Sequence, residues 1–258
     1  MQTKKYFKVF GILIMIIITV WLFLGLVVRL NVNSILFHPL KTYYTYPGIP
    51  LYTQYFLSSS SLTNIDARYY QGTKRDKIIL YFHGNGGMAT PYLQDLILQG
   101  NVLAPSYPGY LDSSGQPTTQ NILEVGDLAY QKAIDLGYRE DQIILWGHSL
   151  GGSVATYLSA KRPGLDKTIL VNTFNNLKSE CEFRIGPAFC IFGDGLLSSD
   201  RYAYGIQGRV RQFHDKQDAT VPYELGQKLY ESIRSKDKKF TAIDGEHNKF
   251  DITETFAD

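Results

Sequence analysis

The stretch that decides the fold is Gln142-Ile143-Ile144-Leu145-Trp146-Gly147-His148-Ser149-Leu150-Gly151-Gly152. It begins with a short apolar run typical of a buried strand, and residues 153–161 beyond it are typical of a helix. Between them lies the pattern G-x-S-x-G, whose glycines permit a sharp turn that lifts the Ser149 hydroxyl over the sheet edge. The pattern alone is weak, and an ordinary turn with a helix-capping serine also fits it. The strand before the pattern and the helix after it therefore favour the interpretation that the turn exposes the Ser149 hydroxyl over the sheet edge.

Outward from this stretch, strand and helix signals alternate along the chain. Apolar runs predict strands at residues 65–70, 77–82, 101–104, 142–146, 168–171, 209–213 and 239–243. Amphipathic or capped segments predict helices at 117–136, 153–161 and 223–234. Short apolar strands separated by helices predict an α/β fold, with a mostly parallel sheet covered by helices on both faces.

A serine hydroxyl becomes a good nucleophile only when a base takes its proton. Of the five histidines, His247 follows the last predicted strand, in a loop that would bring its imidazole over the same sheet edge as Ser149. An exposed loop histidine without this role is the alternative. The other four are less suited by position: His38, His83, His148 and His214.

The base in turn needs a carboxylate to orient it. The run Phe213–Pro222 passes the end of a predicted strand and offers two candidates. Asp218 is preferred because it lies in the loop, a few residues before the helix that starts near Pro222. Asp215 is the alternative.

Attack by Ser149 would create an oxyanion that backbone amides must stabilise. Leu150, at the start of the predicted helix, would supply one amide, and the glycine-rich run 83–87 would supply the other, from Asn85. A phosphate-binding loop is the competing interpretation of this run, but no Lys-Ser/Thr pair follows it. No metal and no organic cofactor are expected.

The N-terminus carries a long apolar segment. Residues 9–28 contain no charge and have the length that a helix needs to cross a bilayer. A cleaved signal peptide is the alternative, but no small-x-small cleavage site follows. Three lysines precede the segment and one arginine follows it, which predicts a cytoplasmic N-terminus.

These signals divide the chain into four parts. We expect a cytoplasmic N-terminus at 1–8, a transmembrane helix at 9–29, a connector at 30–60 and an α/β domain at 61–258. Residues 175–205 interrupt the strand–helix rhythm as a lid-like insert. The domain would then lie outside the cytoplasm, in a periplasm or lumen.

The distribution of charge narrows the classes of partner that the chain could bind. The formal net charge is +2, and its excess lies beside the apolar segment, which argues against a nucleic-acid partner.

Both cysteines, Cys181 and Cys190, lie in the insert. They could pair in an oxidising compartment or stay reduced. Aromatic and aliphatic insert residues could line an acyl pocket, although ordinary packing also explains them: Phe174, Phe183, Phe189, Ile191, Phe192 and Leu196.

Four motifs together resemble the α/β-hydrolase superfamily: HGNGG at 83–87, GHSLGG at 147–152, D-x-x-V-P at 218–222 and the late His247. With the N-terminal span and the LFHP run at 36–39, the chain is similar to the membrane-anchored α/β-hydrolase-domain group, which includes depalmitoylase-like and lysophospholipid or monoacylglycerol lipase-like enzymes. One departure is the run 106–113, where relatives have an Asp, an Arg and a Gly that this chain lacks. It puts the transfer of substrate preference in doubt.

The resemblance implies a serine hydrolase with Ser149, Asp218 and His247 in the usual chain order. The expected substrate is a small-molecule or lipid acyl ester or thioester, met at the membrane. A serine peptidase on the same fold and a non-catalytic membrane scaffold are the alternatives.

Overall fold

The computed structural model describes residues 2–40, 51–87, 90–185, 190 and 195–256. Its strands are β1 (Tyr52–Leu57), β2 (Ile65–Tyr70), β3 (Ile78–Phe82), β4 (Asn101–Pro105), β5 (Ile143–His148), β6 (Lys167–Val171), β7 (Val210–Asp215) and β8 (Lys238–Ile243). Its helices are α1 (Gln2–Leu36), α2 (Thr90–Leu96), α3 (Thr119–Asp135), α4 (Leu150–Lys161), α5 (Leu177–Ile185), α7 (Ser199–Ala203) and α8 (Tyr223–Ser232), with short 3₁₀ helices η1 (Glu140–Gln142) and η3 (Ile252–Phe256).

All eight strands join one sheet, in the order β1-β2-β4-β3-β5-β6-β7-β8. β2 pairs antiparallel with both β1 and β4, and every other neighbouring pair is parallel. β3 to β6 are buried along their whole length, because helices cover them on both faces. The parallel strands end at one edge, so loops that follow them can bring distant residues together.

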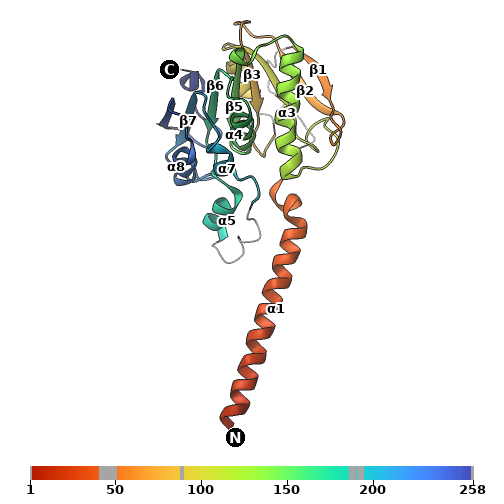
Figure 1. The fold of residues 1–258 in the computed structure, drawn as a ribbon, viewed down its shortest axis with the longest axis vertical. Helices are drawn as coiled ribbons and strands as arrows, with labels where there is room; N and C mark the ends of the chain where they lie inside the picture. Colours follow the sequence, from red (N-terminus) through yellow and green to blue (C-terminus); the bar gives the residue numbers. More distant parts are fainter. Residues whose placement is uncertain (1, 41–50, 88–89, 186–189, 191–194, 257–258) are drawn as a thin grey trace.

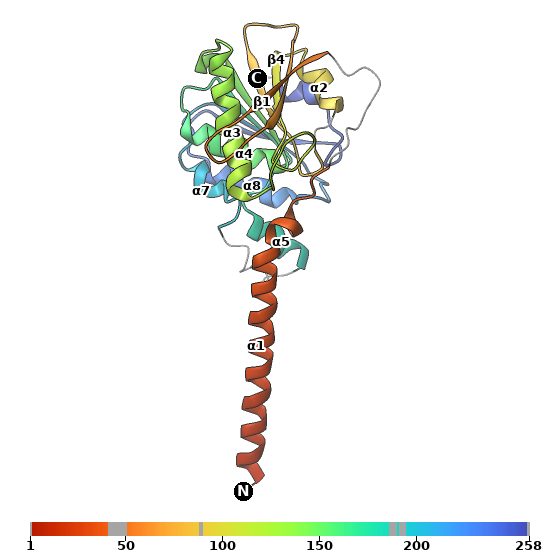
Figure 2. The same ribbon diagram turned by 90° about the vertical axis from the view of Figure 1, so that its right-hand side faces the viewer.

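Two apolar cores lie on the two faces of the sheet. One packs α3, α4, α7 and α8 against the sheet through residues such as Ile122, Val154 and Leu229. The other packs α2 and η3 through Leu93, Leu96 and Ile252 around the buried Trp146 ring. Figures 1 and 2 show these helices on opposite sides of the strands. The predicted α/β class, with helices on both faces, is confirmed.

Helix α1 stands clear of the domain (Figures 1 and 2). Residues Tyr6–Asn31 have the length and hydropathy of a membrane span, and 6% of the most apolar window is buried in the protein. Its apolar side chains are widely exposed, for example Phe7 at 78% and Ile17 at 66%. Exposure of this kind on an apolar helix is what a bilayer, rather than water, accommodates.

The structure differs from the sequence-based boundaries at three places. α1 continues through Leu36, where a connector was expected, and β1 forms a sheet edge inside the same predicted connector. The insert at 175–205 was expected to be irregular but contains α5 and α7. α2 was not anticipated, because it is only seven residues long. Residues 41–50 of the predicted connector lie outside the described residues.

Candidate active site

Ser149 occupies the turn between β5 and α4. Its backbone has φ 53° and ψ −119°, which few residues with a side chain adopt and which a strained strand-to-helix turn imposes. Close approaches require the neighbouring glycines: a Cβ on Gly147 would lie 2.5 Å from the Gly151 carbonyl oxygen, and one on Gly151 would lie 2.0 Å from the Phe82 carbonyl oxygen. The turn is therefore determined by packing as well as by sequence.

Three side chains from the loops after β5, β7 and β8 form one hydrogen-bonded row. The Oγ of Ser149 lies 3.1 Å from Nε2 of His247. The Nδ1 of His247 lies 2.7 Å from Oδ2 of Asp218. A carboxylate can only accept, so Nδ1 carries the proton and Nε2 is free to accept from the serine hydroxyl. These are the three residues that the sequence selected for nucleophile, acid and base.

Asp218 is held in its charged form. Burial alone would raise its pKa, but the hydrogen bond and charge of His247 and two backbone amides together lower the pKa below 3.8. Those amides, of Thr220 and Val221, each donate to Oδ1 at 2.8 Å. The carboxylate is thus fixed on one oxygen by the backbone and uses the other for His247.

The alternative acid, Asp215, bonds elsewhere than to His247. Its Oδ1 accepts a hydrogen bond from the Gln217 amide at 2.6 Å. His214 and His83 are fully buried and bond to backbone carbonyls, of Val221 at 2.9 Å and of Gly84 at 2.7 Å. Burial lowers the pKa of both imidazoles, that of His83 to about 4, so both are neutral near neutral pH.

Two residues that hold the loop of His247 were not selected from the sequence. The backbone carbonyl of His247 accepts from Nε2 of His148 at 2.8 Å and from Nδ2 of Asn172 at 3.0 Å. Burial, with a smaller effect of His247, lowers the pKa of His148 to about 3, so its ring is neutral and donates through Nε2. Asn172 also accepts the amide of Asp215 at 2.8 Å, which ties the ends of β6 and β7 to this loop. A polar residue directly after an apolar strand was the available signal for Asn172.

A cavity of about 460 Å³ opens beside Ser149 and is lined by Asn85 and Leu150, the two residues expected to receive an oxyanion. Leu150 is the first residue of α4, where backbone amides point outward and the helix dipole favours negative charge. Gly84 lies against Ser149, because a Cβ there would be 3.3 Å from Cβ of Ser149. Within the described residues, neither the Asn85 nor the Leu150 amide donates to a backbone carbonyl.

Comparison with known proteins places this arrangement in a family. Residues 79–240 match the model of the alpha/beta hydrolase family. The chain belongs to this family. Among relatives of the chain, the lysophosphatidylserine lipase ABHD12 of Danio rerio is 30% identical over 192 residues, which cover 64% of this chain and 50% of the relative. The uncharacterized protein F37A4.1 of Caenorhabditis elegans is 32% identical over 138 residues, 52% of this chain and 28% of that protein. The chain thus spans half or less of the length of these relatives.

Solved structures share the fold of the chain at low identity. The esterase Pf2001 of Pyrococcus furiosus superposes with a TM-score of 0.67 at 15% identity, over 82% of this chain and 90% of the esterase. An acylaminoacyl peptidase of Pyrococcus horikoshii reaches a TM-score of 0.63 at 17% identity, over 77% of this chain and 38% of the peptidase. At these identities the likeness establishes the architecture alone.

The insert contributes one wall of the cavity. Leu177 and Cys181 line it, next to Phe174, the last residue before the insert, whereas Phe183 is 64% exposed on α5. Cys181 and Cys190 are joined by a disulfide. Of the other insert residues suggested for an acyl pocket, Leu196 lines a different cavity, and Phe189, Ile191 and Phe192 lie outside the described residues.

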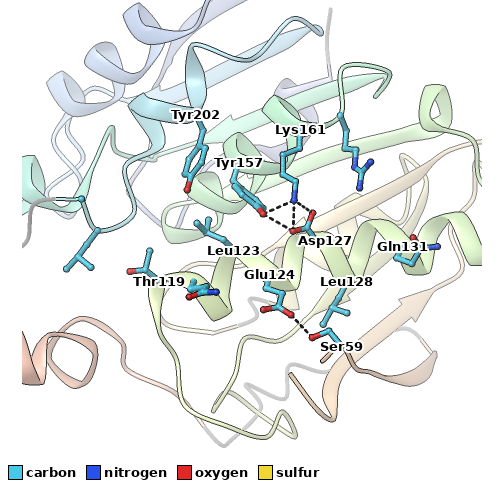
Figure 3. Close-up of a pocket in the computed structure, with 14 residues that line it drawn as sticks. Ser59, Thr119, Leu123, Glu124, Asp127, Leu128, Gln131, Tyr157, Lys161 and Tyr202 are labelled. Atoms are coloured by element: carbon cyan, nitrogen blue, oxygen red, sulfur yellow. Dashed lines mark hydrogen bonds and ion pairs between the residues drawn. The ribbon is translucent and has the colours of Figure 1, made fainter. Parts of the chain in front are cut away.

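That different cavity is larger, about 810 Å³, and is lined by residues of α3 and α4 (Figure 3) but not by Ser149. Its polar side chains bind one another: Lys161 Nζ donates to Asp127 at 2.8 and 2.9 Å and to the Tyr157 hydroxyl at 2.9 Å. Ser59 likewise donates to Glu124. Size alone would favour this cavity, but the smaller one holds the nucleophile.

Proposed function

We propose that the chain is a membrane-anchored serine hydrolase that cleaves carboxylic ester or thioester bonds of acyl lipids or acylated substrates. The observation that carries the proposal is the row from Ser149 through His247 to Asp218, which borders a cavity large enough for an acyl group. A serine with a base 3.1 Å away and a carboxylate behind that base is the arrangement of acyl-transfer enzymes.

The mechanism follows from the positions of the protons. Nε2 of His247 takes the Ser149 proton as Oγ attacks the acyl carbonyl carbon, and the amides of Leu150 and Asn85 bind the resulting oxyanion. The bond from that carbon to the leaving oxygen or sulfur then breaks, and Nε2 returns the proton to the leaving group. Water attacks the acyl-enzyme, gives its proton to Nε2 and releases the carboxylic acid, while Oγ recovers its hydrogen. Asp218 stays ionised and stabilises the imidazolium in both steps.

An acyl-lipid substrate is supported by three features. Relatives at about 30% identity carry the name lysophosphatidylserine lipase. The cavity is lined mainly by apolar side chains, among them Leu36, Phe174, Leu177 and Val221, which suit an acyl chain. The span α1 keeps the domain beside lipid at high effective concentration.

The proposed topology puts residues 1–8 in the cytoplasm, lets α1 cross the membrane and leaves the domain with its insert outside. The Cys181–Cys190 disulfide supports this side, because disulfides persist in oxidising compartments. In sealed spheroplasts, protease added outside should cleave the domain. In sealed microsomes, where added protease meets the cytoplasmic face, the domain should be protected. Protection of the domain in spheroplasts, or its cleavage in microsomes, would reverse the topology.

The test of the activity uses the full chain in lipid vesicles and a panel of acyl esters, thioesters and amino-acid anilides, together with a fluorophosphonate probe. Ser149→Ala should lose ester hydrolysis and labelling. Ser153→Ala is the matched control, because this buried serine of α4 bonds to Ser199 and not to His247. Preferential cleavage of anilides would favour a peptidase. Absence of labelling in a folded sample would favour a non-catalytic scaffold.

A further inference from the structure

The membrane helix runs directly into the active site. Three consecutive residues at its C-terminal end, Leu36, Phe37 and His38, line the same cavity as Ser149. Phe37 is 3% exposed and belongs to the core that packs under α3 and α4. The end of α1 is therefore a wall of the cavity and is anchored in the domain core.

One side chain of the oxyanion loop holds this helix end. Nδ2 of Asn85 donates to the Leu36 carbonyl oxygen at 2.7 Å, and Oδ1 accepts from the His38 amide at 3.2 Å. The Tyr110 hydroxyl donates to the same Oδ1 at 2.6 Å and fixes the amide group from the other side. The residue whose backbone amide is proposed to bind the oxyanion thus uses its side chain to bind the end of α1.

No flexible linker separates the span from this clamp. The candidate span ends at Asn31, and α1 continues for five residues to Leu36. Polar side chains in this part bond back to the helix, Asn31 to the Val27 carbonyl at 2.8 Å and Ser34 to the Asn31 carbonyl at 3.1 Å. At a rise of 1.5 Å per residue, the cavity wall lies about 8 Å beyond the span, close to the outer limit of the lipid headgroups.

A further wall of the cavity comes from α5, which lies at the side of the domain from which α1 projects (Figure 1). α5 carries Phe183, an aromatic ring that is 64% exposed. Exposed aromatic rings are favoured at the membrane–water interface. Both walls therefore lie on the side of the domain that α1 joins to the bilayer.

We propose that α1 is a rigid spacer as well as an anchor: clamped by Asn85, it holds the cavity at a fixed height above the headgroups, and the acyl chain enters from that same bilayer. This inference rests on the proposed ester hydrolysis. It differs from simple tethering. A tether raises the local lipid concentration whatever the height of the cavity above the membrane, whereas a spacer supports hydrolysis only at the one height at which it holds the cavity.

The experiment lengthens α1 above the span. Seven helix-forming residues inserted between Asn31 and Val32 raise the domain by about 10 Å and turn it by only about 20°. The same insertion between Lys4 and Lys5, on the far side of the span, is the control. A flexible glycine–serine insertion of equal length after Asn31 allows the domain to approach the membrane again. Each protein is assayed in phosphatidylcholine vesicles with methylumbelliferyl oleate, which partitions into the bilayer, and with methylumbelliferyl butyrate, which is dissolved.

The helical insertion after Asn31 should lower oleate hydrolysis about tenfold or more and leave butyrate hydrolysis within about twofold, with partial recovery for the flexible insertion and no effect of the control. Unchanged oleate hydrolysis would overturn the spacer. An equal loss on both esters would overturn it too, because height above a bilayer cannot affect a dissolved ester. If the parent chain hydrolysed neither ester, the proposed function itself would fail and the spacer with it.

Discussion

Two regions meet at the cavity, and they are built differently. The catalytic edge, made of Ser149, Asp218, His247 and the supporting His148 and Asn172, is a network of hydrogen bonds at strand ends. The membrane-facing rim, made of residues 36–38 and α5, joins segments from distant parts of the chain and lines the cavity with Leu36, Phe37, Leu177 and Cys181 beside the polar His38 and Glu180. The strand ends of the sheet thus position the residues of the proposed reaction. Residues 36–38 and α5, which lie outside the sheet, determine which substrates reach those residues. Changes at the edge should affect every substrate, and changes at the rim should affect long acyl chains.

The largest effect is expected at the carboxylate of the edge. Asp218→Asn should lower kcat by about 10³–10⁴-fold for short and long esters alike, because an amide no longer stabilises the imidazolium or selects the Nδ1 tautomer. Asp215→Asn is the control, since Asp215 bonds to the Gln217 amide instead of to His247. Steady-state kinetics with butyrate and oleate esters measure the effect. Equal losses in the two variants would contradict the assignment of the acid.

Acid should destabilise the folded chain through two buried histidines, His83 and His148. Burial lowers the pKa of His83 to about 4 and of His148 to about 3, so the unfolded chain binds protons below pH 6.5 that the folded chain does not. Their stabilisation is complete above pH 6.5 and is lost as the pH falls towards 4 and 3, by about 2 kcal/mol each at pH 5. Asp66, whose pKa burial raises to about 6, offsets about 1 kcal/mol of this loss.

Urea unfolding at pH 7.5 and pH 5 measures this dependence. His148→Asn should lessen the loss of unfolding free energy between the two pH values by about 2 kcal/mol. A variant with the same loss as the parent would show that His148 is not the group that titrates.

A smaller effect is expected at Asn172, which supports the loop of His247 without belonging to the row of Ser149, His247 and Asp218. Asn172→Ala removes the donor to the His247 carbonyl and the acceptor for the Asp215 amide. We expect kcat to fall about 10–100-fold with KM nearly unchanged, because the imidazole loses its alignment while the cavity stays intact. Asn172→Asp keeps the acceptor for the Asp215 amide but sets a buried carboxylate oxygen against the His247 carbonyl, so neither kcat nor stability should recover fully. Recovery of both by Asn172→Asp would assign Asn172 a purely structural role.

The edge and the rim also differ in how far the sequence predicts them. Ser149, Asp218 and His247 stand out because each is a polar residue just beyond an apolar strand, in a pattern that local sequence carries. The contact of Asn85 with His38 joins residues 47 positions apart, and no local pattern specifies it. β1 was missed for a related reason: as an edge strand it is mostly exposed and shows no apolar alternation. The register of β1 on β2, with Tyr52 opposite Tyr70, comes from the fold and not from either segment alone.

The smallest effect is expected at the rim, where the Cys181–Cys190 disulfide holds α5. Cys190→Ser removes the crosslink and keeps Cys181 in the cavity wall. A loop of this size constrains the unfolded segment by about 2.5–3 kcal/mol at most, and we expect the loss to stay local to α5 and the insert. Proteolysis within the insert should become faster, and KM for the oleate ester should rise severalfold. Because no hydrogen bond joins the catalytic edge to the insert residues that the structure describes, kcat for butyrate should not change. A parallel fall in kcat for both esters would mean that the rim holds the catalytic edge in place, and the division between the two regions would be wrong.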